Sequence, residues 1–158
     1  MIIVSDSSPL ISLSIISKLD LLVEIFDDFL IPEEVYEEVT RKNKPFASIL
    51  AKHLKSHIKK IKNITAMQVL TMDIGPGEAA AIILALENNI KLILLDDARA
   101  RKVAIHNNLT PVGTLGVLIK AKEKKLIKEV KGYMDQLILN NIHISDTLYK
   151  DVLAMVNE

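Results

Sequence analysis

Short, continuous apolar runs alternate along this chain with longer segments whose apolar residues recur at helical spacing. The clearest runs are Ile2–Ser5 and Lys91–Leu95, the shorter ones are Phe29–Ile31 and Thr110–Val112, and a further strand is predicted around Ile61–Ile64. Continuous runs of this length are typical of strands that a parallel sheet buries on both faces. The pattern therefore predicts an α/β fold with a central, mostly parallel sheet covered by helices.

The helical segments fill the intervals between these runs. Ser8 as N-cap and Pro9 in the first turn would start the first helix. Helices are predicted over Leu10–Phe26 (as two short pieces), Glu33–Arg41, Ala47–Ile58, Glu78–Asn89, Asp97–Asn107 and Leu115–Lys124, with two more after Ile127 that break near Asn140. A length of 158 residues suits one domain over 1–158, in which the role of the helices in 127–158 is open.

Composition removes several classes of function. The chain has no Cys, which excludes disulfides, thiolate zinc sites and cysteine nucleophiles. It contains no phosphate-binding glycine loop, no dinucleotide fingerprint and no serine-hydrolase elbow. Its apolar stretches are shorter than a membrane span, and its N-terminus lacks the basic start of a signal peptide. A cytoplasmic protein is therefore expected.

Acidic residues follow two of the predicted strands directly. Asp6 comes after Ile2–Ser5, and the pair Asp96-Asp97 comes after Lys91–Leu95. The carboxyl ends of parallel strands open onto the crevice where ligands bind. An unpaired charge is costly to bury there, and several converging carboxylates hold Mg²⁺ or Mn²⁺, which prefer oxygen ligands. The pattern predicts a metal-dependent enzyme.

Each of these acids also has a structural interpretation, and the sequence leaves the choice open. Either Asp96 or Asp97 would serve as N-cap of the following helix, although capping uses only one of them. Glu78 lies in the first turn of a mostly apolar helix, where the macrodipole favours an anion. Glu38 belongs to an acidic run in which most members must be solvated.

The formal net charge of zero hides a segregation of charge. Residues 1–38 carry nine acids against Lys18 alone, whereas residues 39–72 carry eight basic residues and no acid. A local patch steers a polyanion more than the total does, because salt screens the field within about 8–10 Å. A solvated helix face explains the basic run equally well. The candidate nucleic-acid contacts are Arg41, Lys42, Lys44, Arg99, Arg101 and Lys102.

The order of motifs resembles the PIN-domain family, in the branch related to VapC-like toxins of bacteria and archaea. The resemblance rests on the segments IIVSDSSPLISL, LIPEEVYEEV, DIGPGEAAAIILAL, KLILLDDARARKVA and PVGTLGVLIKAK, and it covers about residues 1–130. It implies a three-layer α/β/α fold and Mg²⁺- or Mn²⁺-dependent ribonuclease activity. The family's acids would fall on Asp6, Glu38, Glu78 and one or both of Asp96 and Asp97. Many members carry Thr or Ser two residues before the last Asp, where this chain has Leu95.

The resemblance also implies partners. We expect RNA as substrate, a small antitoxin protein as inhibitor and pairing as a homodimer. Metal ligation is expected from Asp6, Glu78, Asp96 and Asp97, with Glu38 completing the catalytic set directly or through water. The alternative is a catalytically weak module that acts by binding protein or RNA, with Leu10–Phe26 as a seam or groove. A phosphatase-like or receiver-like domain fits less well, because no Lys or Thr stands clearly at the remaining strand ends.

Overall fold

A computed structural model describes all residues from 1 to 158. In chain order the elements are β1 (Ile2–Ser5), α1 (Ser7–Ile15), α2 (Leu21–Ile25), β2 (Asp28–Pro32), α3 (Glu33–Val39), α4 (Ala47–Leu54), a short 3₁₀ turn (Lys55–His57), β3 (Ile58–Lys59), α5 (Ile64–Leu70), α6 (Pro76–Glu87), β4 (Leu92–Leu94), α7 (Ala98–His106), β5 (Thr110–Val112), α8 (Thr114–Glu123), α9 (Lys131–Leu139) and α10 (Asp146–Met155). None of these helices is long and apolar enough to cross a lipid bilayer.

The five strands form one sheet in the order β3-β2-β1-β4-β5, and every pair is parallel. The chain starts at the centre with β1, builds outward through β2 and β3, and crosses to β4 and β5. In the register Ile3 lies opposite Phe29 on one side and Leu92 on the other. The order therefore reverses between β1 and β4, where a crevice opens at the carboxyl ends of open α/β sheets.

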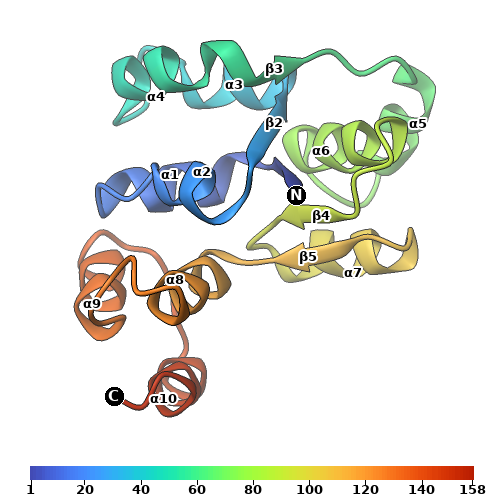
Figure 1. Cartoon of the computed structure of the whole chain (residues 1–158). Helices are drawn as coiled ribbons and strands as arrows, with labels where there is room; N and C mark the ends of the chain where they lie inside the picture. The colour runs from blue at the N-terminus through green and yellow to red at the C-terminus, as the bar shows by residue number, and fades with distance from the viewer.

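Alternate residues of the strands feed two separate hydrophobic cores. Ile3 and Leu94 pack with α1, α2, α8 and α9, whereas Val4 and Ile93 pack with α6 and α7. Figure 1 shows α1, α2, α8 and α9 on the left of the sheet and α6 and α7 on the right. The fold is therefore α/β with three layers, as the apolar runs predicted.

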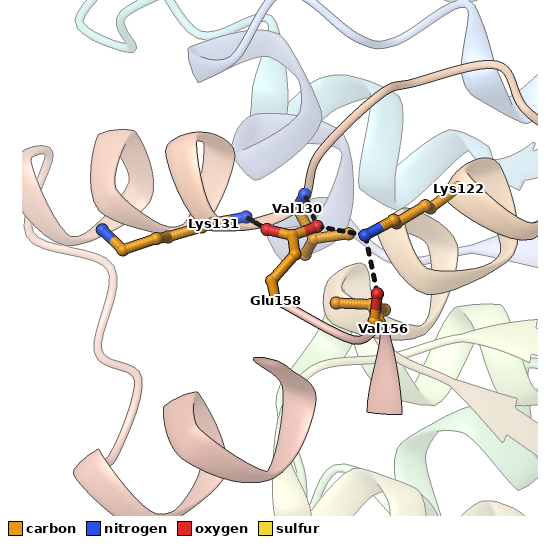
Figure 2. Close-up of polar contacts among 5 residues, drawn as sticks. All are labelled: Lys122, Val130, Lys131, Val156 and Glu158. Carbon is orange, nitrogen blue, oxygen red and sulfur yellow. Dashed lines mark hydrogen bonds and ion pairs between the residues drawn. The ribbon is translucent and has the colours of Figure 1, made fainter. Parts of the chain in front are cut away.

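The C-terminal helices belong to the first of these cores. Val130, Met134 and Leu137 of the α9 region, with Val152 and Val156 of the α10 region, are buried in it. Glu158 fastens this end of the chain by accepting hydrogen bonds from the Val130 and Lys131 N–H groups and from Lys122 Nζ. Figure 2 shows these contacts converging on one carboxylate.

Two local predictions were wrong. The strand expected around Ile61–Ile64 lies earlier, at Ile58–Lys59, and α5 begins at Ile64 instead. The first helix begins at Ser7, so Asp6 and not Ser8 holds the N-cap position. A two-residue edge strand carries too little apolar pattern to be located, and a Pro is compatible with more than one position in a first turn.

Most of the apolar side chains of Leu10–Phe26, suggested as an interaction seam or groove, are used inside the domain. Leu10, Leu13, Leu22 and Phe26 are buried in the core that covers one face of the sheet. Their apolar side chains are therefore used in packing, and the seam is not an exposed groove. The basic run over residues 39–72 is not wholly at the surface either. His57, in the 3₁₀ turn Lys55–His57, stacks its ring on Phe29 with ring centroids 3.9 Å apart.

Candidate active site

Asp6 stands where β1 ends and α1 begins, on the central strand of the sheet. It is the only charged side chain that the fold buries, with 3 % of its surface exposed. Burial, together with the nearby charges of Glu78 and Glu38, raises its pKa from the ordinary 3.8 to about 7. The backbone N–H groups of Ser7 and Ser8 act in the opposite direction. The fold thus holds a carboxyl group where its charged form is disfavoured unless a cation or proton is near.

Glu38 reaches the same place from the last turns of α3. Its Oε2 accepts a hydrogen bond from Ser7 Oγ at 2.9 Å. Ser7 is the residue after Asp6 and is itself buried. The contact joins residues 31 positions apart, so it depends on α3 packing against the start of α1. Ser7 fixes one oxygen of the Glu38 carboxylate beside Asp6.

Gly77, in the first turn of α6, forms the floor between these two acids. A Cβ at this position would stand 2.8 Å from Glu38 Oε2 and 3.1 Å from Asp6 Oδ1. Real side chains do not tolerate such a contact with a carboxylate that packing holds in place. Gly77 therefore leaves open a small cradle into which both carboxylates point.

Glu78 follows directly and brings a third carboxylate. Its Oε2 accepts a hydrogen bond from the Gly75 N–H at 3.0 Å, which anchors the side chain at the start of its own helix. Partial burial raises the pKa of Glu78, and the charges of Asp97 and Glu38 raise it as well. Glu78 is therefore electrostatically coupled to acids from three other parts of the chain.

The structure separates the two neighbouring aspartates. Asp96 accepts hydrogen bonds on both oxygens from Thr114, from the backbone N–H at 2.7 Å and from Oγ1 at 2.6 Å. Asp97 is the N-cap of α7 and accepts from the Ala100 N–H at 2.8 Å through Oδ1. Of these two aspartates, only Asp97 is among the charges that raise the pKa of Glu78. Asp96 ties β4 to the start of α8, whereas Asp97 caps α7 and its charge acts on Glu78.

The acidic cluster is defined as Asp6, Glu38, Glu78 and Asp97. No three of its members, nor any other three His, Asp or Glu side chains, are arranged as a ready metal-ligand set. The donor chemistry nevertheless fits a hard divalent cation, because the cluster supplies carboxylate oxygens around an open cradle. Mg²⁺ typically takes only one or two protein carboxylates and keeps several waters, so the cluster has sufficient donors.

The predicted basic contacts lie in two segments of the chain, one after Glu38 and one after Asp97. Arg41, Lys42 and Lys44 occupy the turn that follows α3 and its Glu38. Arg99 and Lys102 are exposed on α7, where Arg99 pairs with Asp73 at 3.7 Å. Arg101 Nη1 donates to the Leu95 carbonyl oxygen at 3.0 Å, and a Cβ on Gly113 would lie 3.1 Å from that nitrogen.

Sequence reasoning missed three residues that shape the site. Ser7, Gly77 and Thr114 carry no charge, so the search for carboxylates at strand ends passes over them. Weak signals were present, since Ser7 follows Asp6 and Gly77 precedes Glu78. The Gly113-Thr114 turn was noticed only as part of a family motif. Their roles become visible only through contacts between distant segments.

Comparison with known proteins identifies the family of this fold and crevice. A family model described as a PIN domain matches residues 2–158. No curated protein and no solved structure gave a significant match. PIN domains generally have a nuclease-type fold and act on nucleic acid. Because the match extends over nearly all of its length, the chain belongs to the PIN-domain family.

Proposed function

We propose that this protein is a metal-dependent ribonuclease that hydrolyses phosphodiester bonds of RNA. The observation that carries the proposal is the acidic cluster around Gly77, where a buried Asp6 has its pKa raised to about 7 and shares a cradle with Glu38. Such an arrangement destabilises the charged carboxylates unless a cation joins them. Structural acids are ordinarily exposed or paired with a basic group, whereas Asp6 is buried and takes part in no ion pair.

Asp6, Glu78 and Asp97 would hold one or two Mg²⁺ or Mn²⁺ ions, and Glu38 would complete the set. When bound, such an ion lowers the pKa of water and stabilises negative charge on the reacting phosphate. Ser7 holds Glu38 in place by its 2.9 Å hydrogen bond. The raised pKa of Asp6 makes its carboxyl oxygen a proton acceptor near neutral pH when no cation is bound.

Asp96 has a supporting role in this proposal. Both of its oxygens are occupied by Thr114, so it holds the start of α8 against the end of β4. This contact positions the residue that follows it, Asp97, at the mouth of the crevice. We therefore assign Asp97, and not Asp96, as the metal ligand in this proposal.

Basic residues would offset the repulsion between the acidic cluster and the RNA phosphates. Arg41, Lys42 and Lys44 stand in the turn beyond Glu38, and Arg99, Arg101 and Lys102 stand on the helix beyond Asp97. Contacts of this kind supply affinity without sequence preference and weaken with salt. We assign the strand of RNA a path between these two basic segments, across the cradle.

The test is cleavage of a mixed structured RNA by the wild type and by Asp6→Asn, Glu38→Gln and Glu78→Gln, with Mg²⁺, Mn²⁺ or EDTA. Glu37→Gln is the matched control, because Glu37 is exposed on the same helix turn as Glu38. We expect metal-dependent cleavage that the three cluster variants lose and the control keeps. Cleavage that persists in EDTA or in Asp6→Asn would contradict the proposal.

A finer proposal is that the enzyme is the toxin of a toxin–antitoxin pair and acts as a homodimer. Its support is the likeness of the motifs to the VapC-like branch of the family. Induced expression of the wild type would then arrest growth of the host, whereas Asp6→Asn would not. Unimpaired growth with active, folded wild-type enzyme would contradict the toxin role and leave the nuclease proposal intact. Sedimentation of the purified chain tests the dimer.

A further inference from the structure

A groove of about 760 Å³ runs along the free edge of β5, and its lining includes Asp96 but no member of the acidic cluster. Its sides come from α7, α8, the segment 142–144 and α10. Figure 1 shows α10 at the bottom of the molecule, separated from the sheet by α8. The groove is therefore bounded by the body of the domain on one side and by the C-terminal segment on the other.

Aliphatic side chains from each of these segments line the groove. Ile105 of α7 is 60 % exposed, Met155 of α10 is 69 % exposed and Leu148 is 45 % exposed. Ile142 and Ile144 contribute from the connecting segment. Single exposed apolar residues are ordinary on a protein surface, but a contiguous apolar lining marks an interaction site.

Polar contacts hold the outer wall of the groove, in addition to the burial of Val152 and Val156 in the core. Glu158 accepts hydrogen bonds from the Val130 and Lys131 N–H groups, and Lys122 Nζ contacts both Glu158 Oε1 and the Val156 carbonyl oxygen. Figure 2 shows these contacts of Glu158 and Lys122. The groove is thus formed before anything occupies it, which lowers the ordering cost of binding.

The edge of β5 does not favour the addition of a further strand. The Thr110 N–H donates to the Lys91 carbonyl oxygen, and the Val112 carbonyl oxygen accepts from the Leu95 N–H, so both residues face β4. Pro111 between them faces the free edge, where it offers no N–H. Proline on an edge strand blocks strand pairing. An occupant must therefore bind by packing side chains into the groove.

Two of the three charged side chains that line the groove, Arg101 and Lys102, are cationic and have no acidic partner. His143 also stands along the groove. Asp96 is the one acid of the lining, and Thr114 occupies both of its oxygens. The lining contains no Phe, Tyr or Trp on which a nucleic-acid base would stack.

We propose that this groove binds an acidic amphipathic helix of a protein partner. The apolar stripe of the helix, with side chains at positions i, i+4 and i+7, would fill the aliphatic lining. Carboxylates beside the stripe would meet Arg101 and Lys102, which gives the groove its selectivity for an acidic sequence. The groove contains none of the four acids of the acidic cluster, although Arg101 and Lys102 also stand among the residues proposed to contact RNA.

The experiment uses the full chain with methyl-labelled Ile and Met and a synthetic helical peptide of about five turns. The peptide carries Leu at i, i+4 and i+7 with Glu on the flanks, and a matched peptide carries Lys in place of Glu. We expect saturable shifts of the Ile105, Ile142 and Met155 methyl resonances with the acidic peptide. The lysine peptide should bind about tenfold or more weakly, and Lys102→Glu should reduce or reverse this preference.

Ile105→Glu should abolish binding of the acidic peptide, because it places a carboxylate in the apolar lining. Leu139→Glu is the control, since Leu139 is 82 % exposed on α9 and outside the groove. Equal binding of the two peptides, or binding of neither, would overturn the proposal. Two other results would also overturn it: conversion of a dimer into a monomer by Ile105→Glu, and loss of single-stranded RNA binding in that variant without loss of peptide binding.

Discussion

Asp6 is the residue on which burial and charge act most strongly in this domain. Its side chain is shielded from water by the start of α1 and the first turn of α6, and other carboxylates lie beside it. A group in this position titrates in the folded chain near pH 7 and in the unfolded chain near 3.8. The two states therefore bind different numbers of protons over the interval between these values.

The first prediction concerns pH. Without metal, between pH 3.8 and about 7, the folded state keeps a proton on Asp6 that the unfolded state has lost. Stability relative to Asp6→Asn should therefore fall as pH rises through this interval and stay level above it. The total loss should be a few kcal/mol, at about 1.4 kcal/mol for each pKa unit. Urea unfolding of the wild type and of Asp6→Asn in EDTA measures this loss. A difference in unfolding free energy between the two proteins that stays constant across this pH range would contradict the burial of the charge.

The second prediction concerns Gly77. Ala at this position would place its Cβ 2.8 Å from Glu38 Oε2, so Gly77→Ala should displace the carboxylates and lower RNA cleavage by at least about tenfold. Stability should change by only about 1 kcal/mol, because Ala favours the helix while the contact opposes it. Gly132→Ala is the control, since its Cβ would meet only the end of the flexible Glu129 side chain. Full activity in Gly77→Ala would show that the cradle is not the reaction site.

At the scale of elements, the two aspartates after β4 start different helices. Asp97 caps α7, and Asp96 reaches across to the first residue of α8. The adjacent pair therefore serves two helix starts, which removes the sequence argument that one of the acids lacks a structural task. What distinguishes them is that the charge of Asp97, and not that of Asp96, raises the pKa of Glu78.

The third prediction follows from this difference. Asp97→Asn should keep its cap, because Asn is an equally good N-cap residue, and should lose cleavage activity. Asp96→Ala should cost about 1–3 kcal/mol of stability by leaving the Thr114 donors unpaired. Unfolding free energies and cleavage rates, measured for both variants, separate the effect on stability from the effect on activity. If Asp96→Asn abolished activity without loss of stability, while Asp97→Asn stayed active, the assignment would be reversed.

The fourth prediction concerns the attachment of α10. Glu158→Gln should weaken the contacts that attach this end of the chain. The Glu158 carboxylate accepts from its donors through two oxygens, whereas Gln has only one acceptor oxygen. A cost of about 1–2 kcal/mol is expected, with faster amide hydrogen exchange confined to α10. Glu123→Gln provides the control, as its pair with Lys120 is exposed and contributes little. Unchanged exchange in α10 would mean that apolar packing alone holds the helix.

At the scale of the whole molecule, the sheet order brings the acidic cluster together from four distant segments. The fifth prediction is that Mn²⁺ at pH 8 raises the unfolding temperature, because it binds the folded cluster and not the unfolded chain. The gain should approach about 3 kcal/mol at a hundredfold excess over the dissociation constant. Asp6→Asn should lose this gain, and Asp73→Asn, an exposed acid near the start of α6, should keep it. Equal stabilisation of both variants would place the ion elsewhere.

Much of the fold was predictable because its strands are local apolar runs. β1 and β5 lie where the pattern predicted them, and β2 and β4 differ only at their ends. The two-residue β3 was misplaced, and α5 was not predicted, because neither has a strong periodicity over its few residues. The buried role of Leu10–Phe26 also escaped prediction, since an apolar face looks the same in sequence whether a core or a partner covers it.

What the sequence by itself determined was the alternation of strands and helices, the mostly parallel sheet, and the appearance of Asp6 and the pair Asp96-Asp97 at strand ends. These follow from local patterns and from the geometry that all parallel sheets share. Only the tertiary structure decided that Ser7 holds Glu38, that Gly77 opens the cradle and that Thr114 occupies Asp96. The physical reason is that these contacts join segments far apart in the chain, whose approach depends on the packing of the whole domain.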